Sequence, residues 1–141
     1  MNDKYKKYKQ LIELATNLSV AKELTKEATA GYAGTALLAS NGEIYTGKSL
    51  TGICSIAFCG EVGAVLSMLK DGISEIEAIV TVSNDRKLMP PCGRCREMMY
   101  QVDRKNLKTK LLLENGRVVT LNDLFPERAQ ELWETLQEDS S

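Results

Sequence analysis

The chain has 141 residues, of which 43% are hydrophobic and 26% charged, and its formal net charge is −1. This length and composition fit one globular domain with its own core, and the near-neutral charge argues against partners such as nucleic acid or an acidic membrane. The sequence contains no histidine, which excludes mechanisms that need an imidazole, such as a Ser-His-Asp triad or a histidine-bound metal.

The sequence predicts a single domain over residues 1–141. The first part of this domain has a helical pattern of apolar residues. Apolar residues at spacings of three and four predict a helix over 3–18, and we expect the N-terminal helical segment to extend over 1–30. Two apolar runs, at 35–39 and 44–46, flank Asn41-Gly42, a pair typical of tight hairpin turns. These runs predict a β-hairpin after the helical segment.

The rest of the chain alternates between helical and strand patterns. The predicted elements are a helix over 61–69, a strand over 76–82, a helix from Cys92, a hairpin around Asn115-Gly116 and a C-terminal helix over 121–136. Strands that alternate with helices predict an α/β fold with helices covering a mixed sheet.

The chain has four cysteines. It begins without the apolar run of a signal peptide and has no apolar stretch of about 18 residues, so we expect a cytoplasmic protein that does not cross a membrane. In a reducing compartment, cysteines bind metals or take part in catalysis more often than they form disulfides.

Three of these cysteines lie in two short motifs 33 positions apart, Cys59-Gly60-Glu61 and Pro91-Cys92-Gly93-Arg94-Cys95. Both motifs fall where a predicted helix begins, and the positive end of a helix dipole favours thiolate. Three thiolates hold one zinc ion and leave its fourth tetrahedral position open for water, as catalytic zinc sites do. We therefore predict a catalytic zinc site with Cys59, Cys92 and Cys95 as its ligands.

Glu61 lies two residues from the first predicted ligand, where its carboxylate is able to move protons for the zinc-bound water. A glutamate in a first helical turn also stabilises the helix dipole from a solvated position, and that alternative stays open. Three sulfurs weaken the acidifying effect of zinc, so donors to those sulfurs are expected; Arg94 and Arg96 are candidates.

Two other classes of function remain open at this point. If Cys54 or a residue of a partner chain completed the zinc coordination, the protein would be a non-catalytic, zinc-stabilised domain. If Cys92 and Cys95 worked without a metal, it would be a thiol redox protein, and Cys59 and Glu61 would have no role. We favour a place for Cys54 in the core or the pocket lining rather than at the metal.

The motif C-x-E followed by P-C-x-x-C resembles the zinc-dependent cytidine deaminase family. Segments over 32–38, 41–47 and 121–126 are similar to the corresponding family segments, in the same order. The resemblance implies a three-layer α/β/α fold with a five-stranded mixed sheet, and a homo-oligomer, usually a tetramer but otherwise a dimer. It also implies hydrolytic deamination of a cytosine-type nucleoside, with Glu61 as proton shuttle, the carbonyl near Pro91 beside the leaving amine, and an aromatic residue such as Phe125 over a pocket.

One segment departs from that family. Ordinary members carry an Asn-x-Glu pair after the second strand that binds the ribose, whereas this chain has Lys48-Ser49-Leu50-Thr51-Gly52. Ser49 and Thr51 are the candidate substrate-binding residues there, although neither supplies a carboxylate. Blasticidin S deaminase, a related branch, also lacks the usual pair. We expect cytidine or deoxycytidine as the substrate, with a modified cytosine nucleoside or another amino-heterocycle as the alternative.

Overall fold

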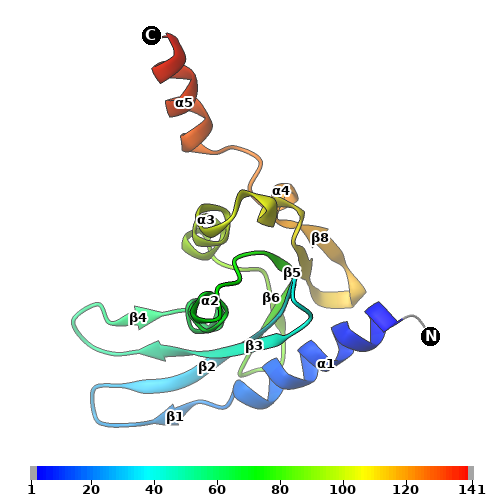
Figure 1. Cartoon of the computed structure of the whole chain (residues 1–141). Helices are drawn as coiled ribbons and strands as arrows, with labels where there is room; N and C mark the ends of the chain where they lie inside the picture. Colours follow the sequence, from blue (N-terminus) through cyan, green and yellow to red (C-terminus); the bar gives the residue numbers. More distant parts are fainter. Residues whose placement is uncertain (1–2, 140–141) are drawn as a thin grey trace.

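The computed structural model describes residues 3–139, and the remaining ends of the predicted 1–141 domain, 1–2 and 140–141, lie outside the described residues (Figure 1). The helices are α1 (Asp3–Leu18), α2 (Gly60–Lys70), α3 (Gly93–Val102), α4 (Leu121–Leu124) and α5 (Ala129–Asp139), with 3₁₀ turns η1 (Arg104–Lys108) and η2 (Glu114–Gly116). The strands are β1 (Lys22–Glu23), β2 (Thr29–Ala39), β3 (Ile44–Thr51), β4 (Ala57–Phe58), β5 (Ile76–Ser83), β6 (Leu88–Met89), β7 (Lys110–Leu112) and β8 (Val118–Thr120). None of these described helices is long and apolar enough to cross a membrane.

The strands of the described residues form one mixed sheet in the order β4-β3-β2-β5-β7-β8, with β1 paired to β2 and β6 paired to β5. Only β5 and β7 run parallel. The predicted α/β/α layering is confirmed, but the sheet has eight strands rather than five. The additional strands β1, β4 and β6 are two-residue ladders, whose pairing depends on distant segments and leaves no hydrophobic period in the sequence.

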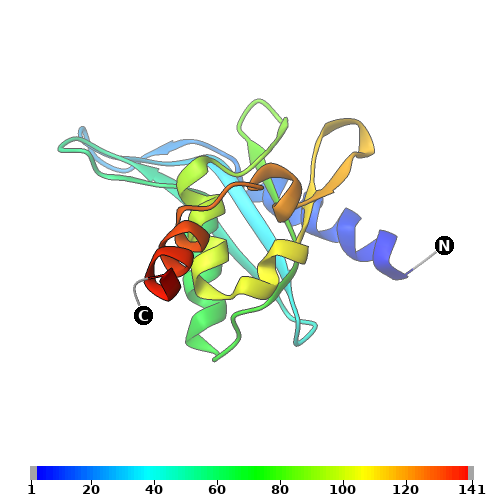
Figure 2. The ribbon, with the colours of Figure 1, turned by 90° about the horizontal axis from the view of Figure 1, so that it is seen from above.

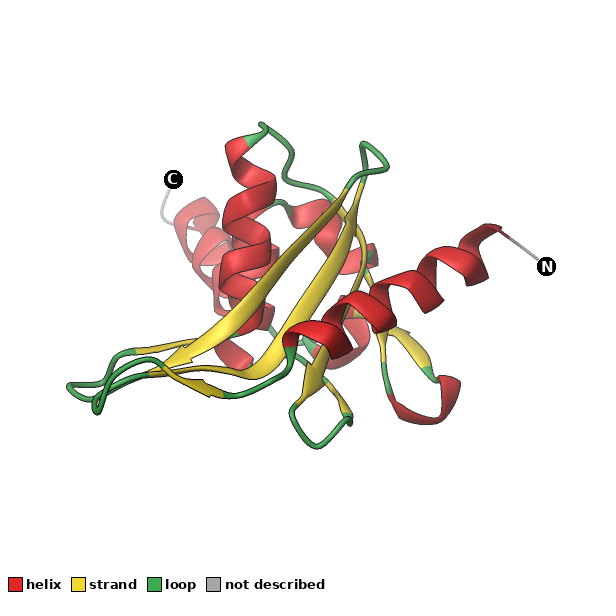
Figure 3. Cartoon of the chain, turned by 90° about the horizontal axis from the view of Figure 1, so that it is seen from below, coloured by secondary structure: helices red, strands yellow, loops and turns green. Residues whose placement is uncertain are grey.

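Alternate residues of β2 and β5 face two separate hydrophobic clusters, one on each side of the sheet. Helix α1 lies across one face, and α2 and α3 cover the other (Figures 1 and 3). The α1 cluster contains Leu11, Ala15, Ala36, Leu38, Ala78, Val80, Val82 and Leu112. The opposite cluster contains Leu37, Ala39, Ala64, Val65, Met68, Ile76, Ile79, Met99, Tyr100, Leu111 and Leu121.

Both predicted turns form. Asn115 and Gly116 have φ angles of 60° and 70° and connect β7 to β8, as expected for an Asn-Gly hairpin loop. Between β2 and β3 only Gly42 takes a positive φ, of 83°, while the Asn41 side chain accepts a hydrogen bond from the Glu43 amide. The β2–β3 hairpin is therefore stabilised by the Asn41 side chain as well as by the positive φ of Gly42.

The predicted helical segment over 1–30 is wrong beyond residue 18. Helix α1 ends at Leu18, and the chain then forms β1, which pairs with the start of β2 through Lys22–Ala30 and Glu23–Thr29. The Leu24 amide donates to the Ala28 carbonyl across the connecting turn. A short helix there would have had little apolar surface to bury, since isolated short helices are marginal without such packing.

The predicted C-terminal helix over 121–136 is also wrong, because it is divided into α4 and α5. Pro126 lies in the break. A proline disfavours helical geometry in the residue before it, and Phe125 has φ −143° and ψ 57°. After the break α5 extends away from the body of the domain (Figure 1), so in the view from above it lies in front of the body (Figure 2).

Helix α2 begins unusually close to the sheet. A side chain at Gly47 of β3 would place its Cβ 2.5 Å from the carbonyl oxygen of Gly60, the first residue of α2. The glycine at position 47 therefore allows the helix backbone to lie directly on β3. This close approach brings the N-terminal end of α2 to the strand residues beneath it.

Candidate active site

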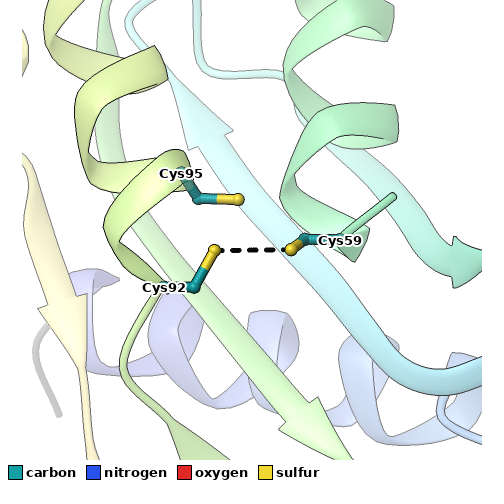
Figure 4. Close-up of side chains that lie close together, drawn as sticks. All are labelled: Cys59, Cys92 and Cys95. Carbon is teal, nitrogen blue, oxygen red and sulfur yellow. Dashed lines mark hydrogen bonds between the residues drawn. The ribbon is translucent and has the colours of Figure 1, made fainter. Parts of the chain in front are cut away.

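Three thiols converge where α2 and α3 begin (Figure 4). Cys59 and Cys92 are the N-cap residues of these helices, and Cys95 lies in the first turn of α3. The sulfur atoms of Cys59 and Cys92 are 3.4 Å apart, and the three sulfurs lie within 4.8 Å of one another. Two sulfurs bound to one tetrahedral zinc ion are about 3.8 Å apart, so the arrangement fits the metal.

This group has three members in the part of the chain that the structure describes, and Cys54 is not one of them. The side chain of Cys54 is exposed, and its residue has a φ of 57° in the loop between β3 and β4. The predicted place of Cys54 in the core or the pocket lining is therefore wrong, although Cys54 lies outside the three-sulfur group as expected. The described residues offer three sulfurs to a metal and no fourth ligand in the same group. Catalytic zinc sites have three protein ligands and keep the fourth tetrahedral position for water.

The thiols differ in their readiness to ionise before a metal binds. Burial raises the pKa of Cys95, and the nearby Glu61 carboxylate raises it further. Burial also raises the pKa of Cys59, together with its hydrogen bond to Cys92. At Cys92 burial acts in the same direction, but hydrogen bonds from the Cys95 backbone and the Cys59 side chain lower the pKa overall.

Glu61, in the first turn of α2, is only 3% exposed. Its Oε1 accepts a hydrogen bond of 2.8 Å from Thr81 Oγ1, and its Oε2 lies 3.7 Å from the sulfur of Cys95. A carboxylate that only stabilised the helix dipole would remain in solvent, so the solvated alternative for Glu61 is excluded. The side chain instead places Oε2 beside the Cys95 sulfur.

A pocket of about 730 Å³ opens in front of these groups, a size typical of small-molecule sites. Cys59, Glu61, Thr81 and Cys92 line it, together with Tyr32 and Phe58. The two aromatic residues are each 47% exposed. A buried carboxylate and two of the metal-compatible sulfurs thus face a cavity that a flat aromatic base is able to enter.

Of the four candidate substrate-binding residues, two line the pocket and two do not. Ser49 and Thr51 both line the pocket. The hydroxyl of Ser49 accepts a hydrogen bond from the Ala33 amide at a register shift between β2 and β3, which leaves its proton for another acceptor. Thr51 lies further out and is exposed.

Pro91 and Phe125 are not brought to this pocket. Pro91 is buried, and its carbonyl accepts a hydrogen bond from Arg96 Nε; Pro90 lines the pocket in its place. Phe125 packs edge-on against Tyr100, with ring centroids 5.9 Å apart. A contact of either residue with substrate stays a prediction.

The two candidate arginines have different positions. Arg94 lines the pocket, where its guanidinium lies 5.9 Å from the centre of the Phe58 ring and donates to the Ala57 carbonyl. Arg96 lies behind the ligand loop and donates to the carbonyls of Pro91 and Leu124. Their hydrogen bonds within the described chain go to backbone oxygens, so donation to sulfur stays a prediction.

Sequence reasoning missed Thr81 and Thr35. Their hydroxyl oxygens are 2.7 Å apart on adjacent strands, on the face that α2 covers. A threonine within an apolar strand was the available signal, but the sequence alone does not tell which helix start lies above it.

No protein-family model matches this chain. A cytidine deaminase of Halalkalibacterium halodurans is 27% identical over 96 residues, which cover 66% of this chain and 73% of that protein. Among solved structures, the cytidine deaminase of Burkholderia pseudomallei has a TM-score of 0.67 and 25% identity, and covers 85% of this chain and 97% of its own.

The cytidine deaminase of Bacillus anthracis has a similar fold over nearly the whole molecule. Its TM-score is 0.68 at 19% identity, with 99% of this chain and 100% of that chain covered. The curated relatives, the shared fold and the three-cysteine group agree with one another. The chain is therefore similar to cytidine deaminases in sequence and in fold.

Proposed function

We propose that this chain is a zinc-dependent hydrolase that deaminates a cytosine-type nucleoside, converting cytidine or deoxycytidine to uridine or deoxyuridine and ammonia. The observation that carries the proposal is the buried Glu61 carboxylate, 3.7 Å from the Cys95 sulfur and lining the same pocket as Cys59 and Cys92. The similarity to cytidine deaminases in sequence and fold supports the same reaction.

The donor set fits zinc. Cys59, Cys92 and Cys95 would hold the ion, because three thiolates suit a soft, tetrahedral metal better than Mg²⁺ or Ca²⁺. Zinc, when bound, lowers the pKa of a coordinated water and thereby supplies a nucleophile near neutral pH.

The protein's own part in the reaction belongs to Glu61. Its carboxylate accepts a proton from the attacking water and delivers it to N3 of the base as the new C4–O bond forms. A second proton passes through Glu61 to the amine, and the C4–N bond breaks to release ammonia. The near-complete burial of Glu61 keeps bulk water from competing for these protons.

The residues proposed to face the substrate's sugar differ from those of ordinary family members. The Asn-x-Glu pair of ordinary family members is replaced by residues 49–51, so hydroxyl groups of Ser49 and Thr51 are the polar candidates on that side. Arg94 adds a positive charge to the pocket lining. The missing Asn-x-Glu pair is the reason for the second candidate, a modified cytosine nucleoside such as blasticidin S or another amino-heterocycle, while cytidine or deoxycytidine remains the first.

We also propose that copies of the chain assemble, as a homotetramer or a homodimer in the cytoplasm. Leu132 and Trp133 of α5 are each 60% exposed, and the pocket residues Tyr32 and Phe58 are each 47% exposed. Exposed apolar groups of this size favour protein contacts. Light scattering of wild type and of Leu132→Ser/Trp133→Ser tests the assembly; a larger wild-type species that dissociates in the variant is expected, and a monomeric wild type would contradict it.

The function is tested by ammonia release from zinc-loaded protein. The panel contains cytidine, deoxycytidine, cytosine, blasticidin S, adenosine and guanosine, with metal content measured on the same sample. We expect release from at least one cytosine-type compound. One zinc per chain without release from any compound would favour the non-catalytic zinc domain, and absence of zinc from protein purified in zinc would favour the redox alternative.

A further inference from the structure

Glu61 is connected to the sheet beneath it by two buried hydroxyl groups. Thr81 Oγ1 lies 2.8 Å from Glu61 Oε1 and 2.7 Å from Thr35 Oγ1. Thr35 is fully buried and Thr81 is 5% exposed. The two threonines occupy paired positions on β2 and β5, so the sheet register itself sets their spacing.

The directions of these hydrogen bonds follow from the chemistry of the groups. Thr81 Oγ1 donates its single hydroxyl proton to Glu61 Oε1. Thr81 then has only lone pairs to offer at its other contact, and the proton between the threonines comes from Thr35. The chain of donation therefore runs from Thr35 through Thr81 to Glu61.

Gly60 makes room for this arrangement. A Cβ added at position 60 would lie 2.6 Å from Thr35 Oγ1 and 3.2 Å from Thr35 Cβ. These distances are too short for non-bonded atoms, and Thr35 is held in a packed interior. The glycine in Cys59-Gly60-Glu61 thus allows the Thr35 hydroxyl to sit beneath the first turn of α2.

We propose that the Thr35–Thr81 hydroxyl pair, accommodated by Gly60, positions the Glu61 carboxylate for proton transfer. The proposal rests on the function proposed above. Thr81 holds Oε1 against the sheet, and this fixes Oε2 on the side of the Cys95 sulfur. Thr35 acts through Thr81, because its donated hydrogen bond fixes the Thr81 hydroxyl in the donating orientation.

A purely structural role would predict a different pattern of effects. The neighbouring pair on the same face of these strands, Leu37 and Ile79, is apolar. Valine at position 81 would keep the volume and the strand preference of threonine and would remove only the hydroxyl. The cost of that change should therefore fall on the placement of Glu61.

The first test compares Thr81→Val with Thr81→Ser in zinc-loaded enzyme. Misplacement of a reacting group by about 1 Å costs up to roughly 100-fold, so we expect kcat to fall about 10- to 100-fold in Thr81→Val with KM changed less than about twofold. Thr81→Ser retains the hydroxyl and should recover most of kcat. The proposal is overturned if Thr81→Val keeps wild-type kcat, or if valine and serine lower kcat equally.

The matched control is Thr109→Val. Thr109 is also buried, and its hydroxyl donates to the Ile76 carbonyl on a part of the sheet away from the pocket. We expect this variant to lower the unfolding temperature while kcat stays unchanged. An equal loss of kcat in Thr109→Val and Thr81→Val would assign the effect to general destabilisation and overturn the proposal.

The second test uses the contact between Gly60 and Thr35. Gly60→Ala should lower kcat because its Cβ displaces the Thr35 hydroxyl. In Thr35→Ala, which removes that oxygen, adding Gly60→Ala should cost much less than it does in wild type. Equal costs in the two backgrounds would separate Gly60 from the hydroxyl pair and contradict this part of the proposal.

A measurement without turnover separates this inference from the proposed function. Thr81→Val should lower the unfolding temperature by about 3 °C more in wild type than in Glu61→Ala, where the hydroxyl has already lost its acceptor. Equal shifts in both backgrounds would overturn the positioning role. If wild type released no ammonia from any compound, the proposed function would fail, and this comparison would still decide whether Thr81 holds Glu61.

Discussion

The two faces of the sheet use the same strands for different purposes. On the α1 face, β2 and β5 contribute Ala36, Leu38, Val80 and their neighbours to an apolar cluster. On the opposite face the same strands contribute Leu37 and Ile79, and then Thr35 and Thr81 where α2 begins. Successive residues of a strand point to opposite faces, so one residue packs in the α1 cluster while the next faces α2 and the candidate site.

The reactive groups depend on the α1 cluster, although they lie on the opposite face of the sheet. The α1 cluster fixes the register of β2 and β5, and that register sets the spacing of the two threonines. Changes in the α1 cluster should therefore alter stability, whereas changes at the two threonines should alter chemistry.

Removal of the metal should have the largest effect. Chelation, or Cys92→Ser, should abolish ammonia release, because the three sulfurs form the candidate zinc site. Neither hydrophobic cluster contains one of these cysteines, so the metal-free chain should still unfold cooperatively. Circular dichroism with a metal assay checks this separation; a chain that loses its fold with zinc would contradict it.

Glu61→Gln should have the next largest effect. Glutamine keeps the shape of the side chain, and its carbonyl still accepts from Thr81, but it does not carry protons. We expect kcat to fall ~10²–10⁴-fold with zinc still bound. Steady-state rates and metal content of the same preparation check this, and near-normal turnover would refute the proton-shuttle assignment.

Zinc affinity should depend steeply on pH. The raised pKa values of Cys59 and Cys95 keep both thiols protonated near neutral pH in the metal-free chain, and zinc binding releases those protons. Acid therefore weakens binding, and the apparent Kd should rise by about 100-fold per pH unit as pH falls from about 8 to 6. Competition with a chelator of known affinity measures this slope; a pH-independent Kd would contradict it.

The smallest effect on activity is expected on the α1 face. Leu11 is fully buried there, and Leu11→Ala should lower the free energy of unfolding by about 2–5 kcal/mol. We expect kcat and KM to remain at wild-type values below the unfolding transition. Urea denaturation and kinetics on one preparation test this, and a loss of kcat without unfolding would show that the two faces are not separable.

Prediction from sequence succeeded where a local pattern was sufficient. The spacing of Cys59, Cys92 and Cys95 led to a metal group, and the structure places the three sulfurs together. The Asn115-Gly116 pair predicted a hairpin turn that forms as expected. Each of these features is encoded by a few residues with special chemistry or backbone freedom.

Prediction from sequence failed where a contact depended on residues far apart in the chain, or where the effect of a proline on a helix was overlooked. The partners of Thr81 are 20 and 46 positions away along the chain, so no window of sequence contains the contact. Pro91 and Phe125 were assigned from resemblance alone, and the structure gives them other partners. The division of the C-terminal helix, by contrast, was readable from Pro126.

The two hydrogen bonds of Arg96 bear on the order in which the protein is made. One guanidinium donates to the Pro91 carbonyl, just before the first ligand of α3, and to the Leu124 carbonyl at the end of α4. All three cysteines have been synthesised once the growing chain reaches residue 95, but Leu124 is added 29 residues later. The ligand loop therefore reaches its final form only after Leu124 has been added, and a ribosome-bound chain that ends before Leu124 should bind zinc less tightly than one that extends past it.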